Sequence, residues 1–285
     1  STIDGDLTLI SGNASGITDS GTVTVDGNLI ATTDAGNGVI DMDTLEVDGT
    51  IALTTNGNGA ATVVNDAGLT FAASTVRGAL SATATTGNIT QGSGDLAITG
   101  AATFITVAGG SNIILDGSGN AFAAAVTLRA GDGTDEAFGN ITFVDSAAVK
   151  LHTSAGTDGD LFIDGHPDRA VGGNLSITAT TGNITQGAAV TVTGTSSFTT
   201  LATDAVITLS STNVLGGAVT LSTTGSSAHA ILDNGTANID IAAASVGGNL
   251  TLRSGAAAGI TDSGTVTVGG NLTATTDANS GVIDL

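Results

Sequence analysis

The chain has 285 residues, of which 43 are Gly, 26 are acidic and only 5 are basic, so its formal charge is −21. This charge excludes a nucleic-acid-binding surface, which needs clustered Lys and Arg, and argues against docking on an anionic membrane. Hydrophobic residues make up 40% of the chain, which is enough to form a core, although the absence of Cys means that no disulfide can hold it.

The stretch GITDSGTVTV at 16–25 recurs letter for letter at 259–268. The match extends on both sides at a constant offset, because most positions of 11–42 are identical to those of 254–285. A second pair lies between them, LSATATTGNITQG at 80–92 and LSITATTGNITQG at 175–187. Repeats of this kind predict a chain of structural units that pack only on their neighbours. Since the chain starts in the middle of the pattern and lacks an initiator Met, we expect it to be a processed or excised piece of a longer array.

A shorter unit of about 22 residues runs through these repeats, because apolar residues recur at offsets +2, +4, +12, +18 and +20 from successive glycines. From Gly5, Gly27 and Gly248 they are Leu7, Leu9, Ile17, Val23 and Val25, then Leu29, Ala31, Val39, Leu45 and Val47, and finally Leu250, Leu252, Ile260, Val266 and Val268. From Gly78 and Gly173, with some positions one place early, they are Leu80, Ala82, Ile89, Leu96 and Ile98, then Leu175, Ile177, Ile184, Val190 and Val192. We expect the glycine that starts each unit to form a corner that a Cβ would obstruct.

Each unit predicts three short strands. The L-x-L and V-x-V pairs alternate with period two, as in a strand with one buried face, and the central G-x-I-T is a third strand. Gly, Asn, Asp, Ser and Thr, the usual turn residues, separate them. Such short strands cannot form a sandwich, but they can stack coil on coil. We therefore predict an all-β, right-handed parallel β-helix (a β-solenoid) of about 12 coils of about 22–24 residues, with three short strands per coil, as one continuous segment over 1–285.

The stretch 129–171 is the least repetitive and gathers several acidic residues, which suggests two interpretations. One is a divergent coil with longer surface turns. The other is a weak Ca²⁺ site, because Ca²⁺ prefers carboxylate oxygens, although the spacing matches neither an EF-hand nor the calcium-binding nonapeptide. We expect no other cofactor, and the candidate metal ligands are Asp132, Asp135, Glu136, Asp158 and Asp160.

Two stretches, GGNLSITATTGNITQGAAVTVTGTSSFTT and GGNLTLRSGAAAGITDSGTVTVGGNLTATT, resemble the repeat regions of filamentous-haemagglutinin-like proteins, which are very large bacterial exoproteins. The resemblance covers essentially the whole chain as a degenerate repeat. It implies a right-handed parallel β-helix, an extracellular or bacterial cell-surface location, and a role in adhesion or matrix formation. Export by two-partner secretion is implied by the same analogy.

These observations favour a structural or adhesive segment of a large adhesin or fibre, and not an enzyme. Its expected partners are other copies of itself, end to end or side by side, or the surface of a host or neighbouring cell. We expect neither nucleic-acid binding nor membrane insertion. One alternative is a polysaccharide-binding or polysaccharide-cleaving β-helix, which usually needs exposed aromatic rings. Another is an ice-binding solenoid, although the T-x-T pairs at 22–24, 83–85, 178–180 and 273–275 fall at different positions of the predicted coil.

Overall fold

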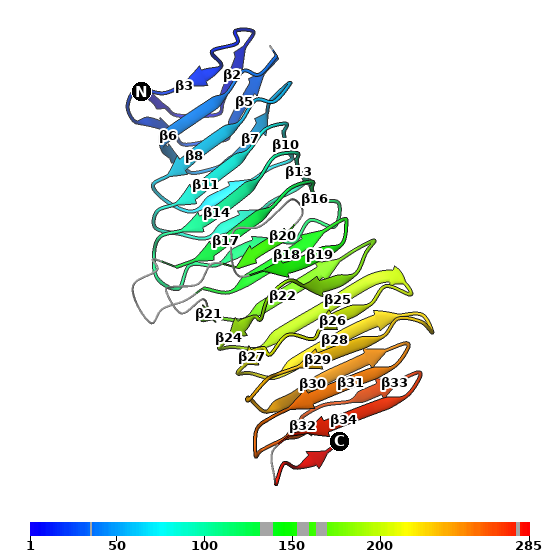
Figure 1. Ribbon diagram of the computed structural model, residues 1–285. Coiled ribbons are helices and arrows are strands. Elements are labelled where there is room, and N and C mark those ends of the chain that lie inside the picture. The colour runs from blue at the N-terminus through cyan, green and yellow to red at the C-terminus, as the bar shows by residue number, and fades with distance from the viewer. Residues whose placement is uncertain (35, 132–138, 153–159, 164–169, 278–279) are drawn as a thin grey trace. The chain divides into compact units, whose positions relative to one another are not determined.

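The computed structural model describes residues 1–34, 36–131, 139–152, 160–163, 170–277 and 280–285, and for 152, 160–163 and 170 it describes the backbone alone. These residues form 35 β-strands and no helix, and every strand pair that is resolved among them is parallel (Figure 1). The prediction of an all-β solenoid of about 12 stacked turns is thus confirmed. The chain divides into two compact units, the first reaching Asn140 and the second starting at Ile141.

Most coils of unit 1 contain one strand of five residues and two shorter strands. The longer strands are β2 (Leu7–Ser11), β5 (Leu29–Thr33), β7 (Thr50–Thr54), β8 (Ala61–Asn65), β11 (Leu80–Ala84), β14 (Ala102–Thr106) and β17 (Val126–Ala130). The others are β1 (Thr2–Ile3), β3 (Ile17–Thr18), β4 (Val23–Val25), the bent β6 (Ile40–Val47), β9 (Leu69–Phe71), β10 (Ser74–Val76), β12 (Ile89–Gln91), β13 (Leu96–Ile98), β15 (Ile113–Leu115) and β16 (Ala121–Phe122). The exceptions are β6, a bent strand of eight residues, and β7 and β8, two successive strands of five residues.

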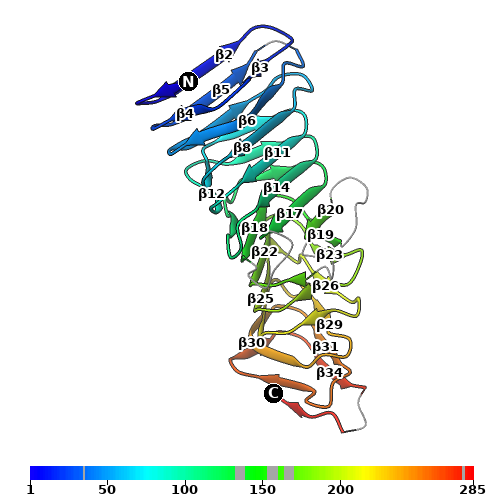
Figure 2. The same cartoon turned by 90° about the vertical axis from the view of Figure 1, so that its left-hand side faces the viewer.

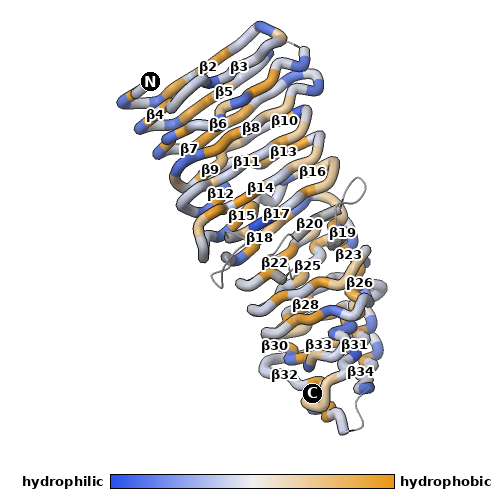
Figure 3. The backbone as a smooth tube through the Cα atoms, turned by 60° about the vertical axis from the view of Figure 1, so that its left-hand side comes forward, coloured by the Kyte–Doolittle hydropathy of each residue, from blue (hydrophilic) through white to orange (hydrophobic). Residues whose placement is uncertain are grey.

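The columns expected at the start of unit 1 are present. Leu7 pairs with Leu29, and Leu29 pairs with Ile51, one coil apart each time. Leu29 and Ile51 are at most 1% exposed, whereas the residues between inward positions face outward. Figure 3 shows hydrophobic and hydrophilic segments following one another along the coils of this unit.

Two details of the predicted register were wrong in unit 1. A third was wrong in unit 2, where Leu250 lies in the column of Ile184, through Ile207 and Ala230, and not in that of Leu175.

The two errors in unit 1 concern Ile17 and Leu80. Ile17 stacks on Ile40 and not on Val39, because the loop before β6 is one position longer than the pattern assumes. Leu80 does not share the column of Leu7. It stacks on Ala61, which stacks in turn on Ile40.

The physical cause of the second error is an exchange of faces within unit 1. In the first coils the longer strand (β2, β5, β7) lies on one face and the two shorter strands lie on the other. From β8 onward this is reversed, because β7 is followed by the two short strands β9 and β10, while the bent β6 is followed by the single strand β8. The step from Ala61 to its partner Leu80 is also shorter along the chain than the step from Ala102 to Val126, so a fixed period cannot locate the change.

Unit 2 is built in the same way and contains the same exchange. Strands β18, β22, β25 and β28 form one face, and β19, β23, β26, β29, β31 and β34 form another (Figure 2). The bounds are β18 (Ile141–Asp145), β19 (Val149–His152), β20 (Asp160–Ile163), β21 (Ala170–Val171), β22 (Leu175–Ala179), β23 (Ile184–Gln186), β24 (Thr191–Val192), β25 (Ser196–Thr203), β26 (Ile207–Leu209), β27 (Val214–Leu215), β28 (Val219–Thr224), β29 (Ala230–Asp233), β30 (Ile239–Val246), β31 (Leu250–Ser254), β32 (Ile260–Asp262), β33 (Val266–Val268), β34 (Leu272–Thr276) and β35 (Ile283–Asp284).

Glycine is required at the corners where coils touch. A Cβ on Gly49 would lie 2.4 Å from the carbonyl oxygen of Gly27, and a Cβ on Gly100 would lie 2.5 Å from the carbonyl carbon of Gly78. Both distances are shorter than real contacts allow, so these corners pack backbone on backbone. Among the glycines predicted to start coils, the expectation of an obstructed corner is confirmed at Gly27 and Gly78, where a Cβ would lie 2.4 Å from an oxygen of the preceding coil. It is wrong at Gly5, where a Cβ would meet nothing within 4 Å.

Two buried asparagines mark the exchanges of faces, Asn65 in unit 1 and Asn234 in unit 2, and both are 0% exposed. Asn65 Oδ1 accepts a hydrogen bond from Val47 N at 2.8 Å, and its Nδ2 donates to Val47 O at 3.0 Å. Asn234 makes the same pair of bonds to Leu215, at 2.8 and 3.0 Å. In each unit a short third ladder, β1–β4–β6 or β21–β24–β27, ends at the residue that the asparagine contacts. The amide side chain thus replaces the backbone of the strand that would have come next.

We predict that replacing Asn65 by Leu, which has a similar size, destabilises the surrounding coils by about 2–4 kcal/mol, because the buried N–H and C=O of Val47 lose their partners. Amide hydrogen exchange in β6 and β8 should accelerate, while exchange in unit 2 should not change. The matched control is Asn271→Leu, since Asn271 is exposed. Equal exchange in the two variants would contradict the assigned role.

Candidate functional site

The predicted calcium ligands cannot be compared with the structure. Asp132, Asp135, Glu136 and Asp158 lie outside the described residues, and Asp160 is described only as backbone at the start of β20. Within the described part of the chain, no three His, Cys, Asp or Glu residues are grouped so that they could hold a metal ion. The calcium site therefore stays a prediction.

The neighbourhood of these residues is irregular, as the sequence suggests. Ile141 pairs with Leu175, and Leu175 pairs with Ser196, so the first of these two coils takes up a much longer stretch of chain than the second. Within the longer coil, β19 pairs with β20, the strand that follows it directly in the chain. The extra length lies within the stretch 129–171 that breaks the repeat pattern.

A charged hollow of about 470 Å³ lies on the outside of unit 2. Its lining includes Arg253 on β31, Asp233 on the preceding coil and Asp277 on the following one. The guanidinium lies 2.8 Å from an oxygen of Asp277 and 3.4 Å from an oxygen of Asp233. Sequence reasoning missed this trio, although opposite charges one coil apart, at 233, 253 and 277, were a usable signal.

The positive charge of Arg253 is already balanced by the carboxylates of Asp233 and Asp277. The hydrogen bond to Asp277, together with the charges of Asp277 and Asp233, raises the pKa of Arg253 above its usual value. A cation already held between two carboxylates has little capacity left to bind a phosphate or a sugar acid. The arrangement therefore cross-links three coils, and this makes it a weak candidate for a ligand site.

Among the described side chains, no Phe ring is exposed on the surface for a sugar to stack on. Phe71, Phe104, Phe122, Phe143 and Phe198 are all buried, at 7% exposure or less. In unit 1 three of them form an internal column, in which the Phe71 and Phe104 ring centroids are 5.9 Å apart and those of Phe104 and Phe122 are 6.1 Å apart, edge to face. These rings stabilise the core and do not face a ligand.

An array of hydroxyl groups covers the outer side of β18, β22, β25 and β28. The strand register aligns two outward columns, which we call the hydroxyl face. The first column contains Thr142, Ser176, Ser197 and Thr220, and the second contains Thr178, Thr199 and Ser222 after Val144. The T-x-T motifs lie on different strands, whereas mixed Ser and Thr residues gather on this one face.

Comparison with known proteins identifies the repeats. A family described as "Repeats of unknown function (DUF5649)" matches residues 58–129, 138–222 and 227–285. No curated protein and no solved structure matches the chain. Among the described residues, no helix has the length and apolar character needed to cross a membrane.

We predict that Arg253→Gln lowers the thermal unfolding midpoint of unit 2 at low salt, because Asp233 and Asp277 lose the cation between them. The difference from the unchanged chain should largely vanish in 1 M salt, where the screening length is about 3 Å. Thermal unfolding followed by circular dichroism at both salt concentrations tests this. A difference that is independent of salt would show that Arg253 stabilises the coils by packing.

Proposed function

The chain belongs to this family of repeats of unknown function. We propose that it is a structural segment of a large extracellular bacterial adhesin or fibre-forming protein. Its task is to provide length and a uniform, polar outer surface. The segment carries no catalytic group in this proposal. Its partners are further copies of the repeat, or the surface of a host or neighbouring cell.

One observation carries the proposal: the duplicated sequence forms the same structure in both units. Ile17 pairs with Ile40 in unit 1, and Ile260 pairs with Ile283 in unit 2, at the same separation along the chain. The glycines that precede these strands, at 16 and 259, have φ of 79° and 75°. A Cβ on either would lie 1.9 Å from a carbonyl oxygen of the next coil. Coils that keep their structure wherever they occur are interchangeable building elements, which suits a protein that grows by repetition.

The charge distribution supports an assembly that depends on ions. Every charged side chain in the stretch 1–48 is acidic: Asp4, Asp6, Asp19, Asp26, Asp34, Asp41, Asp43, Glu46 and Asp48. Like charges on neighbouring molecules repel until salt screens them or a divalent cation bridges them. Side-by-side association is therefore expected to require salt or divalent cations.

We predict that the purified chain forms elongated assemblies, visible by negative-stain electron microscopy, once salt or millimolar Ca²⁺ is added. Light scattering at low salt should report dispersed molecules. A parallel assay for hydrolysis of acidic polysaccharides is expected to show no activity. Dispersed molecules under every condition, or hydrolysis of a polymer, would contradict the proposed function.

The hydroxyl face favours a second candidate, an ice-binding surface. Its Ser and Thr side chains project from four adjacent strands in two columns. Strand geometry spaces such groups at about 4.8 Å between strands and about 6.6 Å along them, which gives a regular lattice of hydroxyls that could order water. Thr is also simply a favourable outward residue of strands, so the lattice by itself does not require this function.

Thermal hysteresis decides between the two candidates. The structural proposal predicts a freezing point equal to the melting point, within error, and no change in the variant Thr199→Lys, which interrupts the hydroxyl face at its centre. A hysteresis gap that Thr199→Lys abolishes, and that the outward substitution Thr103→Lys in unit 1 leaves intact, would instead establish ice binding.

A further inference from the structure

The identity between the two copies of the repeat extends to their strand pairing at the first residues of the chain. Thr2 pairs with Thr24, and Ile3 pairs with Val25. At the offset of the duplicated sequence, the same register joins Ser245 to Thr267 and Val246 to Val268 in unit 2. The first residue also matches, because Ser1 N donates to Thr22 O at 2.7 Å, as Ala244 N donates to Thr265 O at 3.0 Å.

The two copies differ in what lies before these residues. In unit 2, β31 pairs with β29 on one side and with β34 on the other, and β32 pairs with the first half of β30. Their counterparts in unit 1 are β2 and β3. Among the described strands, β2 pairs only with β5, and β3 pairs only with β6. We call β2 and β3 the open edge.

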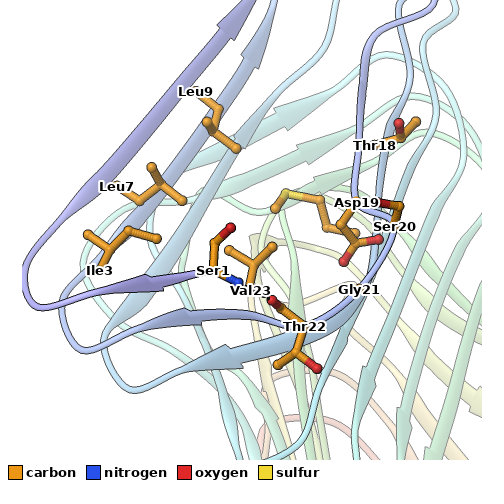
Figure 4. A pocket seen from close by; sticks show the side chains of 11 residues that line it. Ser1, Ile3, Leu7, Leu9, Thr18, Asp19, Ser20, Gly21, Thr22 and Val23 are labelled. Atoms are coloured by element: carbon orange, nitrogen blue, oxygen red, sulfur yellow. Dashed lines mark hydrogen bonds between the residues drawn. The ribbon is translucent and has the colours of Figure 1, made fainter.

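A hollow of about 630 Å³ adjoins the open edge. Ile3, Leu7, Leu9 and Val23 direct their side chains into it (Figure 4). Leu7, Leu9 and Ile17 are only partly buried. Their counterparts in unit 2 are 0% exposed, namely Leu250, Leu252 and Ile260. The same side chains therefore become fully buried when one more coil is added.

Unit 2 shows which side chains achieve this burial. Ala230 stacks on Leu250, Leu232 on Leu252, and Ile239 on Ile260. The backbone closes the same contact, since Ala230 N donates to Asn249 O at 2.8 Å and Ile239 N donates to Gly259 O at 2.9 Å. At the open edge the corresponding acceptors are the carbonyl oxygens of Asp6 and Gly16. The charged trio of unit 2 has no equivalent at the open edge. Ile10 occupies the position that corresponds to Arg253, which pairs with Asp233 in unit 2.

We propose that the open edge is a docking surface for one further coil with the sequence type of residues 228–243, supplied by another copy of the duplicated block. Ala230, Leu232 and Ile239 of that copy stack on Leu7, Leu9 and Ile17. This inference rests on the proposed structural function for its biological meaning, and it adds the register in which successive blocks join. Residues 1–3 already occupy the first positions of that interface, so the added coil continues a ladder that exists.

The test joins residues 228–249 directly to Leu7 of the otherwise complete chain, so that they replace residues 1–6. Amide exchange in β2 and β3 is expected to slow by at least about tenfold, because those strands gain a neighbour on their free side. The matched control carries the same graft with Leu232→Asp and Ile239→Asp. Exchange in the rest of unit 2 reports whether each variant is folded.

Unchanged exchange in β2 and β3, or equal slowing by the control graft, would overturn the inference. A concentration effect in the ungrafted chain would also overturn the inference. If amide exchange in β2 and β3 of that chain slowed at high protein concentration to the rate seen in the grafted chain, a second molecule would be occupying the open edge in place of the proposed coil. A failure of this inference can be told apart from a failure of the proposed function. The inference is tested on the grafted chains, whereas assembly into fibres and hydrolysis of polymers are measured on the ungrafted chain.

Discussion

The structure depends on one constraint: a coil of about 22 residues cannot bury its own apolar side chains or pair its own strands. Its backbone bonds are made to the next coil, as when Leu7 N donates to Asn28 O at 2.8 Å and Ile40 N donates to Ala60 O at 2.9 Å. Its inward side chains are covered by those of the coils on either side. The stability of each coil therefore depends on its contacts with the neighbouring coils. These contacts require the coils to approach closely at the corners, where backbone packs on backbone.

The same constraint explains two of the buried polar positions in the core. When the longer strand moves from one face to another, a third ladder must end inside the stack, and its last backbone groups would be left without partners. Asn65 and Asn234 solve this in the same way, with an amide side chain that both accepts and donates. The outward side chains are mostly Ser, Thr, Asn and Asp, so one coil can take the place of another in the stack. The proposed structural function rests on this property.

Sequence reasoning predicted the class of fold and the first columns, because Leu7, Leu29 and Ile51 obey a constant spacing. It failed where spacing changed, placing Val39 inward instead of Ile40 and Leu80 in the column of Leu7. A period describes the length of a coil but not the face on which a coil begins. The signal for the exchange was present in ATVVN at 61–65, where Asn occupies an inward position of an alternating strand. The stretch that contains the candidate calcium ligands does not recur elsewhere in the chain. The repeat pattern therefore could not predict where their side chains lie.

The stacking of coils in unit 1 can be measured directly with spin labels, because the chain has no Cys. Thr62, Ser81, Thr103 and Thr127 face outward in one column, so Thr62 and Thr127 are three coils apart. Labels on Thr62→Cys and Thr127→Cys should show strong dipolar coupling in continuous-wave electron paramagnetic resonance, with a backbone separation of about 14 Å. The absence of dipolar broadening, corresponding to labels more than about twice that distance apart, would contradict parallel coils stacked at the spacing of a β-sheet.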